Sequence, residues 1–323
     1  MKKLVYLIIP MLVFCLCLGA CAPSDSVKIT VNEVTHSVFY APFYAAVNLG
    51  YFRNEGLEIE LVNGGGSDKS MTALLSGQAQ FALLGPETAV YVLNEGRENY
   101  AKIIAQLTRK DGSFLLGKEK DDSFTWDSLR GKSIIGGRKG GMPQMMLEYA
   151  MRKNGVLPGE DATVRTDVSF DLMGGAFMGG SDDYVALFEP VASTMEMAGQ
   201  GYIVASIGEA SGDVPYTCFA CLDSYISKND GTVKAFLAAL KKGQEFVRDS
   251  SPEKVVQAIK SSFPDSDEQL LLAVVQRYKG IDVWNTDIKM KKEDYDRLID
   301  IITQAGIIQT APEFEKITAG ELW

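Results

Sequence analysis

Residues 27 to 96 repeat one pattern of apolar and polar positions three times. In each repeat a short apolar run ends at a turn marked by glycine or proline, and a segment long enough for a helix follows. The apolar runs are Val27 to Val34, Leu57 to Val62 and Ala79 to Leu84. Because short apolar runs bounded by turn residues are typical of buried strands, the pattern predicts three strand–turn–helix units.

The residues at both ends of each predicted helix are typical of helix termini. Each helix begins at a proline, whose missing N–H costs nothing in the first turn, or at a serine suited to the N-cap position. These starts are Pro42, Ser67 and Pro86. Each helix ends at a glycine, which readily adopts the left-handed conformation that closes a helix. These ends are Gly50, Gly77 and Gly96.

Strand–turn–helix units in series predict parallel strands, with all the turns at the carboxyl edge of one sheet. The N-termini of the helices then meet at that edge, where they offer unpaired N–H groups and a partial positive charge. Ligands of open α/β sheets bind at this edge. Residues 36 to 96 are therefore expected to form half of a small-molecule site.

The middle of the chain repeats the same arrangement. Three more apolar runs each precede a turn and then a helical segment, so a second parallel sheet is predicted. These runs are Ser133 to Ile135, Thr163 to Val168 and Asp183 to Phe188. A chain of 323 residues exceeds one ordinary core, which independently favours two lobes.

The predicted fold is α/β, with two lobes whose central sheets are flanked by helices. Lobe 1 is expected to comprise residues 27–110 plus 215–323, and lobe 2 residues 111–214. Residues 208–213 are predicted to be a flexible connection, and the helical segments after Asn229 are expected to cover lobe 1. The two crossings between lobes would form a two-strand hinge, and such hinges close over ligands.

The first twenty residues have the pattern of a targeting segment. A positive start and an apolar run from Leu4 to Leu18 precede Leu18-Gly19-Ala20-Cys21, which resembles the lipobox of bacterial lipoprotein signal peptides. The resemblance implies a signal peptide over residues 1–20, a lipidated Cys21 and a tether over residues 21–26. The alternative is an ordinary signal peptide cut near Ala20 or Ala22. We predict a protein anchored by lipid at the extracytoplasmic face of the cell membrane.

The composition excludes several function classes. Asp and Glu total 42 against 32 Lys and Arg, and the predicted cleavage removes two of those lysines. An acidic surface opposes nucleic-acid binding. Gly131-Lys132-Ser133 is no phosphate loop, because the Gly required five residues earlier is replaced by Trp126 and the triplet precedes a strand.

A Cys-x-x-Cys spacing at Cys218 and Cys221 raises the question of redox or metal chemistry. The surrounding residues are typical of a strand, where side chains three apart point to opposite faces, roughly 10 Å apart. A zinc site would need further ligands, and the sole histidine, His36, is distant in sequence. We predict two ordinary small apolar residues and no metal site.

Four segments of the chain carry a resemblance to a known family. They are Ala41 to Leu57, Ala73 to Ala79, Trp126 to Lys132 and Phe188-Glu189-Pro190. Their motifs resemble those of solute-binding proteins of nitrate/sulfonate/taurine-type and thiamine-pyrimidine ABC importers. The resemblance implies the type II periplasmic-binding-protein fold, a ligand held between two lobes, and delivery to a permease with a cytoplasmic ATPase. We also expect a monomer without a cofactor.

One relative in that group is an enzyme, the fungal pyrimidine synthase of thiamine biosynthesis. It uses its own histidine and a cysteine-rich motif with iron. This chain has a single histidine and no cysteine-rich run, so we expect a binding protein and not an enzyme.

The predicted ligand site draws on the turns of both lobes. Glycine N–H groups can approach a ligand closely, carboxylates can accept from ligand N–H or O–H groups, and aromatic rings can stack on a flat ligand. The candidate residues are His36, Phe39, Tyr40, Tyr44, Gly65, Gly66, Ser67, Gly85, Glu87, Arg138, Gly140, Gly141, Ser169, Asp171 and Glu189.

These candidates favour one ligand class over another. A carboxylate that faces a bound anion is costly, so Glu87 and Glu189 disfavour nitrate or a sulfonate. Carboxylates beside aromatic rings suit a planar solute with N–H donors, such as an aminopyrimidine or another thiamine precursor. The alternatives are a nitrate, sulfonate or taurine binder of the same class, and a membrane-tethered sensor that presents its ligand to a receptor.

Overall fold

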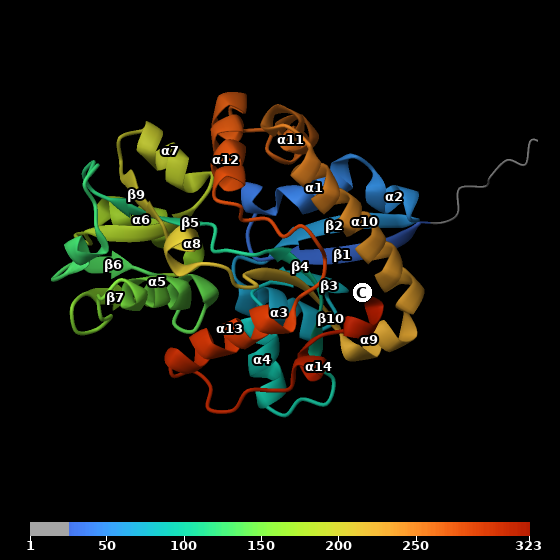
Figure 1. Cartoon of the computed structure of the whole chain (residues 1–323). Coiled ribbons are helices and arrows are strands. Elements are labelled where there is room, and N and C mark those ends of the chain that lie inside the picture. Colours follow the sequence, from blue (N-terminus) through green and yellow to red (C-terminus); the bar gives the residue numbers. More distant parts are fainter. Residues whose placement is uncertain (1–25) are drawn as a thin grey trace, which may run out of the picture.

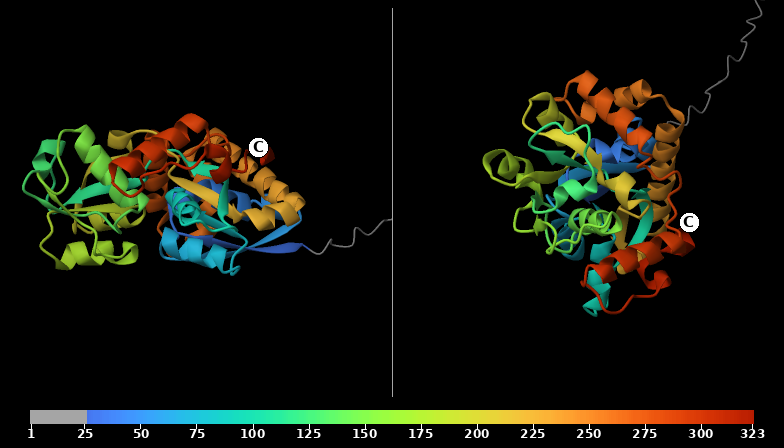
Figure 2. Two further views of the ribbon diagram at one scale, coloured as in Figure 1. Left: turned by 90° about the horizontal axis from the view of Figure 1, so that it is seen from below. Right: turned by 60° about the vertical axis from the view of Figure 1, so that its left-hand side comes forward.

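The computed structural model describes residues 26–323, which form two five-stranded sheets flanked by helices (Figure 1). The strand order is β2-β1-β3-β10-β4 in the first sheet and β7-β6-β8-β5-β9 in the second. The two sheets lie side by side in the elongated view of Figure 2. The predicted signal peptide and Cys21 lie outside the described residues.

The first sheet contains the three strands predicted near the N-terminus. Strand β1 pairs in parallel with both β2 and β3, which confirms the predicted parallel arrangement. Strand β10 then runs antiparallel to β3 and to β4. The bounds are β1 Val27–Glu33, β2 Leu57–Asn63, β3 Phe81–Leu84, β4 Ala101–Thr108 and β10 Thr217–Leu222.

The second sheet repeats this topology. Strand β6 pairs in parallel with β7 and β8, and β5 runs antiparallel to β8 and β9. In each sheet the fourth strand in this order is the first strand that the chain forms after it leaves the other sheet. The bounds are β5 Ser113–Gly117, β6 Ser133–Ile135, β7 Thr163–Arg165, β8 Tyr184–Phe188 and β9 Tyr202–Ser206.

Helices follow the parallel strands as predicted, and the predicted glycine ends have positive φ values of 76°, 76° and 79° at Gly50, Gly77 and Gly96. The bounds in the first half are α1 Ala41–Asn48, α2 Tyr51–Asn54, α3 Ser67–Leu75, α4 Glu87–Asn94 and α5 Met142–Lys153. Short 3₁₀ turns precede α1 at Val38–Tyr40, cover Trp126–Leu129, and precede α6 at Phe170–Leu172.

Two local predictions are wrong. Ser67 is the first residue of α3 and Gly66 occupies the N-cap, because the Ser67 hydroxyl is turned to accept from the Gly85 N–H. The segment expected to be flexible after Ile207 contains helix α8 (Ile207–Ser211), whose N-cap Ser206 accepts from the Glu209 N–H. A small capped helix thus replaces the expected loop.

The remaining helices cover the sheets. Their bounds are α6 Met173–Gly179, α7 Val191–Met197, α9 Asp223–Lys228, α10 Asp230–Asp249, α11 Pro252–Ile259, α12 Glu268–Gly280, α13 Lys292–Gln304 and α14 Phe314–Ile317, with 3₁₀ turns at Lys260–Ser262 and Gly320–Leu322. None of the helices in residues 26–323 combines the length and the apolar character that a membrane span requires.

The long helix α10 packs on α1 and on the first sheet through aromatic rings. The rings of Phe81 and Phe236 stack with centroids 4.3 Å apart. Gly243 lies so close to the Pro42 carbonyl that a Cβ there would collide with it, so α1 and α10 make backbone contact. This core fixes α1, and with it the loop between β1 and α1.

The C-terminal helices were expected to cover lobe 1, yet α12 also packs on α7 and α13 on α5, beside the second sheet (Figure 1). They therefore bridge the two sheets. Cys218 and Cys221 on β10 are buried free thiols, which confirms that they form no disulfide.

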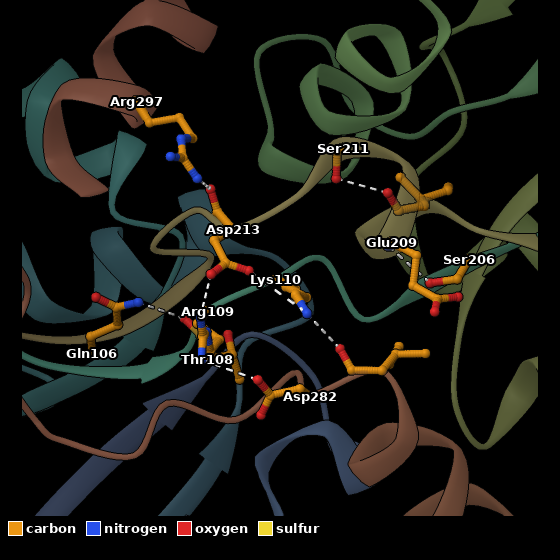
Figure 3. A network of polar contacts seen from close by, with 12 residues as sticks. Gln106, Thr108, Arg109, Lys110, Ser206, Glu209, Ser211, Asp213, Asp282 and Arg297 are labelled. Atoms are coloured by element: carbon orange, nitrogen blue, oxygen red, sulfur yellow. Dashed lines mark hydrogen bonds and ion pairs between the residues drawn. The ribbon is translucent and has the colours of Figure 1, made fainter. Parts of the chain in front are cut away.

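Two connections join the sheets, residues 109–112 after β4 and residues 212–216 before β10. They bond to each other through the Val214 N–H and the Arg109 carbonyl at 2.8 Å. Figure 3 shows their polar contacts, in which Arg109 pairs with Asp213 and, at 3.1 Å, with Asp282. Asp282, which follows α12, thus forms an ion pair with the first connection.

Candidate functional site

A cavity of about 280 Å³ lies between the two sheets, where the turns after their parallel strands face each other. The turns after β1, β2 and β3 form one side, and those after β6, β7 and β8 form the other. Tyr216, at the end of the connection into β10, and Thr217, the first residue of that strand, also line it. A cavity of this size fits a small heteroaromatic or aliphatic solute.

Contacts between the two sides close the rim of this cavity. Ser37 Oγ donates to the Glu189 carbonyl at 2.6 Å, and the Tyr91 hydroxyl donates to the Gly140 carbonyl at 2.8 Å. Arg138 Nε lies 3.4 Å from Asp68 Oδ1. The two lobes therefore meet around the cavity in this structure.

Glu87 is the most unusual residue of the cavity. It begins α4, it is 0% exposed, and neither carboxylate oxygen has a hydrogen-bond partner among residues 26–323. Burial raises the pKa of Glu87 to about 7, although the positive charge of Arg138 acts to lower it. Gly85 makes room, because a Cβ at that position would overlap the Glu87 carboxylate.

An unpartnered buried carboxylate is costly unless something binds it. No Lys or Arg lies within salt-bridge distance of Glu87 in the described chain. Its oxygens can accept hydrogen bonds from a ligand that enters the cavity. The site therefore offers an acceptor to N–H or O–H groups.

Aromatic rings form another part of the cavity wall. Tyr40, Phe170, Phe188 and Tyr216 all line it. The ring centroids of Phe188 and Phe170 are 5.6 Å apart, and those of Phe188 and Tyr216 are 6.0 Å apart. Such rings suit the flat face of a ligand.

The turns that lead into α3 and α5 add backbone N–H groups and charged side chains to the cavity wall. Gly65 and Gly66, with φ values of 72° and 148°, lead into α3, and Gly141 precedes α5. The first N–H groups of both helices lack intrahelical partners. Lys69 and Arg138 line the cavity, as do Asp68 and Asp167.

The structure brings most of the predicted residues together at the cavity. These are Tyr40, Gly65, Gly66, Ser67, Gly85, Glu87, Arg138, Gly141 and Ser169. They follow the strands of both sheets, because the alternation of strand and helix places every such turn at the facing edges.

Three predicted residues at the start of α1 lie outside the cavity. Phe39 is 0% exposed, because its side chain packs into the core. The Tyr44 hydroxyl donates to Glu33 Oε2 at 2.6 Å. His36 bridges Glu33 Oε1 at 2.8 Å and the Ser262 carbonyl at 2.6 Å, so it ties the loop after β1 to the 3₁₀ turn after α11.

Three more predicted residues do not line the cavity, namely Glu189, Gly140 and Asp171. Glu189 is 1% exposed, accepts from the Ser193 N–H and hydroxyl at 2.9 and 2.8 Å, and pairs with Arg277 of α12. The carbonyl of Gly140 accepts from Tyr91 across the rim, and Asp171 is exposed. Glu189 is thus a buried, fully partnered structural carboxylate.

The sequence analysis missed several cavity residues. Tyr216 ends the second connection and Thr217 begins β10. Only the predicted return of the chain to the first sheet could have indicated them. The others are close in sequence to predicted turns, namely Val34, Thr35, Asp68, Lys69, Met142, Pro143, Thr166, Asp167, Val168, Phe170 and Phe188.

Comparison with known proteins gives matches in both sequence and structure. A family model described as "NMT1/THI5 like" matches residues 38–254. A Bacillus subtilis (strain 168) protein named "Putative binding protein YtlA" is 41% identical over 290 residues, which are 90% of this chain and 87% of that protein.

Among solved structures, the ligand-binding component of an ABC-type import system from Staphylococcus aureus, with zinc bound, superposes with a TM-score of 0.74 and 15% identity, over 92% of this chain and 97% of that one. The periplasmic nitrate-binding protein NrtA from Synechocystis PCC 6803 gives 0.72 and 15%, over 93% and 88%. These matches confirm the predicted periplasmic-binding-protein fold.

Proposed function

This chain belongs to the NMT1/THI5-like family, and on that premise we propose that it is the substrate-binding protein of an ABC import system that captures a small planar solute carrying N–H donors. The cavity between the sheets receives the solute, and the turns after the parallel strands contact it. An aminopyrimidine or a related thiamine precursor has the required chemistry.

Glu87 is the observation that supports this ligand class most. Its two carboxylate oxygens are buried, unpartnered and on the cavity wall. A ligand N–H would give each oxygen the hydrogen bond it lacks, whereas an anionic ligand would place a second negative charge beside it. The aromatic rings of Tyr40, Phe170 and Phe188 would hold the flat faces of such a ligand.

We propose a binding protein and not an enzyme, and the relative that is 41% identical is named as a putative binding protein. The cavity supplies a hydrogen-bond acceptor, aromatic walls and helix N-termini, which hold a solute without changing it. Release would follow the opening of the two connections, and the solute would pass to a permease with a cytoplasmic ATPase.

A nitrate or sulfonate ligand is the second candidate, and the donors of the cavity wall favour it. Lys69, Arg138 and the N-termini of α3 and α5 are all suited to an anion. Arg138, however, already faces Asp68, and an anion deeper in the cavity would meet Glu87. The anion site would therefore be confined to the part of the cavity near Lys69 and the starts of α3 and α5.

We also propose that Cys21 carries the lipid anchor and holds the protein at the extracytoplasmic face. The Leu18-Gly19-Ala20-Cys21 sequence supports this. A Cys21→Ser variant should leave the membrane fraction, and a variant that remains there unchanged would contradict the anchor.

A thermal-shift panel on the fragment that begins at Ala22 tests the ligand class. 4-Aminopyrimidine, 2,4-diaminopyrimidine, thiamine, riboflavin, nitrate, taurine and ethanesulfonate would be compared. A ligand at 100 times its Kd should stabilise the protein by about 2.7 kcal/mol, which is several degrees in melting temperature. Shifts with the sulfonates or nitrate alone would overturn the proposed class and favour the second candidate.

A further inference from the structure

We propose that Ser67 is a specificity-determining residue of the cavity: its hydroxyl donates to an acceptor atom of the ligand, while the Glu87 carboxylate accepts from an N–H group attached to the same ligand carbon. The ligand class is thereby narrowed to heterocycles that carry an acceptor and an N–H donor on one carbon. The inference rests on the proposed function, because it concerns the same cavity and the same glutamate.

The hydroxyl of Ser67 accepts a hydrogen bond but donates none. The Gly85 N–H donates to Ser67 Oγ at 3.0 Å, which occupies one lone pair of that oxygen. A serine hydroxyl also has one hydrogen to donate. Within residues 26–323 the Ser67 hydroxyl donates to no acceptor. Because Ser67 lines the cavity, this hydrogen is available to a ligand there.

Helix α3 does not need this hydroxyl for its own first turn. Gly66 occupies the N-cap, and no side chain caps the helix. The Gly66 N–H donates to the Val34 carbonyl at 2.9 Å, and the Ser70 N–H donates to the Gly66 carbonyl at 3.0 Å. These backbone bonds hold the start of α3 against the residue that follows β1, so they fix the position of Ser67.

Gly85 brings the Glu87 carboxylate close to this hydroxyl. A Cβ at Gly85 would lie 2.0 Å from Glu87 Oε2 and 2.7 Å from Oε1, so the carboxylate packs against the Gly85 backbone. The N–H of the same glycine binds Ser67. Both Glu87 oxygens are nevertheless unpartnered in the described chain, so Ser67 does not donate to them. A donor and an acceptor thus adjoin one glycine, and all three residues line the cavity.

Both groups lie on the same side of the cavity. Ser67 begins the helix after β2 and Glu87 begins the helix after β3, so their separation does not depend on how far the two sheets are apart. Arg138, by contrast, lines the cavity from the turn after β6, on the opposite side. The donor and the acceptor are therefore preorganised before the lobes meet around a ligand, which reduces the cost of binding.

A donor next to an acceptor matches a ligand edge with the opposite order. In 4-aminopyrimidine the ring nitrogen N3 accepts and the amino group on the adjacent carbon donates. Aniline has the same amino group but a C–H in place of that nitrogen. It would satisfy Glu87 and leave the Ser67 hydrogen without an acceptor, which is costly in a site closed to water. The two rings therefore separate the role of Ser67 from that of Glu87.

Calorimetric titration of both rings into the fragment from Ala22, at pH 8 and thus above the Glu87 pKa of about 7, tests the inference. The wild type should bind 4-aminopyrimidine roughly 10-fold more tightly than aniline. Ser67→Ala should lose this preference through weaker binding of 4-aminopyrimidine alone, because only that ring accepts from the hydroxyl. Ser67→Thr keeps a hydroxyl and should restore the preference.

Ser76→Ala is the matched control. It makes the same substitution at the C-terminal end of α3, where the hydroxyl donates to the Ala73 carbonyl at 3.1 Å. It should leave both affinities unchanged. Melting curves show whether each variant is folded, and Ser67→Ala should melt at a lower temperature because the Gly85 N–H loses its acceptor.

The outcomes separate the inference from the proposed function. If the wild type binds 4-aminopyrimidine no more tightly than aniline, the inference fails alone, whatever the variants do. Equal losses for both rings in Ser67→Ala would also overturn it, because they would indicate that Ser67 only positions Glu87 through Gly85. An equal effect of Ser76→Ala would indicate a general change in α3 and would count against it too. If the wild type binds neither ring, the proposed ligand class fails and the inference fails with it.

Discussion

Two glutamates occupy matching places in the two halves of the molecule, and their surroundings differ completely. Glu87 follows β3 of the first sheet and Glu189 follows β8 of the second, each beside a proline at the start of a helix. Both are buried. Glu189 is bonded to Ser193 and Arg277, whereas both oxygens of Glu87 are unpartnered in the described chain.

The difference shows that position in the fold alone does not assign a role. A carboxylate with a full set of donors has no lone pair to offer a ligand, and it stabilises the structure that surrounds it. A carboxylate without donors costs stability and is available for binding. The pair thus separates a residue that holds α12 against the second sheet from a residue that lines the cavity without a partner in the described chain.

The largest effect should follow from removing the partner of Glu189. Arg277→Leu leaves that carboxylate buried without its cation, so the free energy of unfolding should fall by about 3 kcal/mol, toward the lower end for a broken buried pair because the Arg277 side chain is 30% exposed. Urea unfolding measures this loss.

Arg138→Leu is the matched control on the Glu87 side. Arg138 pairs with Asp68, and both side chains are well exposed, at 41% and 53%. Its removal should change stability by less than about 1 kcal/mol. Equal losses of stability in the two arginine variants would contradict the claim that Glu189 depends on an arginine partner and Glu87 does not.

The next effect is a pH dependence carried by Glu87. Its pKa is about 7 in the folded chain and near 4.5 when unfolded, so the folded state holds more protons between these values. Stability should therefore fall as pH rises from 4.5 to 7 and stay constant above that. The full penalty at pH 8 amounts to about 3 kcal/mol.

Glu87→Gln should remove this penalty, so the variant should equal the wild type near pH 4.5 and exceed its stability at pH 8. Asp111, whose pKa is also about 7, remains in both proteins and cancels in the difference. Unfolding curves at a series of pH values supply the measurement. A variant less stable than the wild type at pH 8 would show that Glu87 has partners.

A smaller effect concerns a third buried carboxylate, Glu33, which is partnered by His36. The hydrogen bond to Glu33 raises the pKa of His36 above 6.5, and the bond to the Ser262 carbonyl acts in the same direction. The stabilisation is then fully present below pH 6.5 and is lost as the pH rises through the folded pKa. His36→Gln should cost about 1 kcal/mol at pH 5.5 and less at pH 9, since the imidazole is partly exposed.

Because His36 is the sole histidine, one imidazole resonance in an NMR titration reports its pKa directly. A value above 6.5 is expected. A pKa below 6.5 would mean that Glu33 does not stabilise the charged ring. Glu33 could then no longer be counted among the partnered carboxylates.

The sequence predicts the elements and the parallel pairing well, since both depend on local patterns. The runs at Val27, Leu57 and Ala79 became parallel strands, and the glycines at 50, 77 and 96 close their helices. The residues of the turns between strand and helix line the cavity for the same reason. The alternation of strand and helix brings those turns to one edge.

The sequence does not reveal which polar groups are already occupied. Arg277, which neutralises Glu189, is far along the chain on α12, and Ser262, which accepts from His36, is equally remote. These contacts depend on how the C-terminal helices pack across both sheets, which no local pattern encodes.

Calorimetric titration of 4-aminopyrimidine into the wild type, Glu87→Gln and Glu189→Gln tests the central claim most directly. The account predicts a Kd roughly 10- to 100-fold weaker for Glu87→Gln, the cost of losing a hydrogen bond to a charged acceptor. It predicts an affinity within about threefold of the wild type for Glu189→Gln, provided that this variant is folded. The reverse pattern, with Glu189→Gln impaired and Glu87→Gln unchanged, would contradict it.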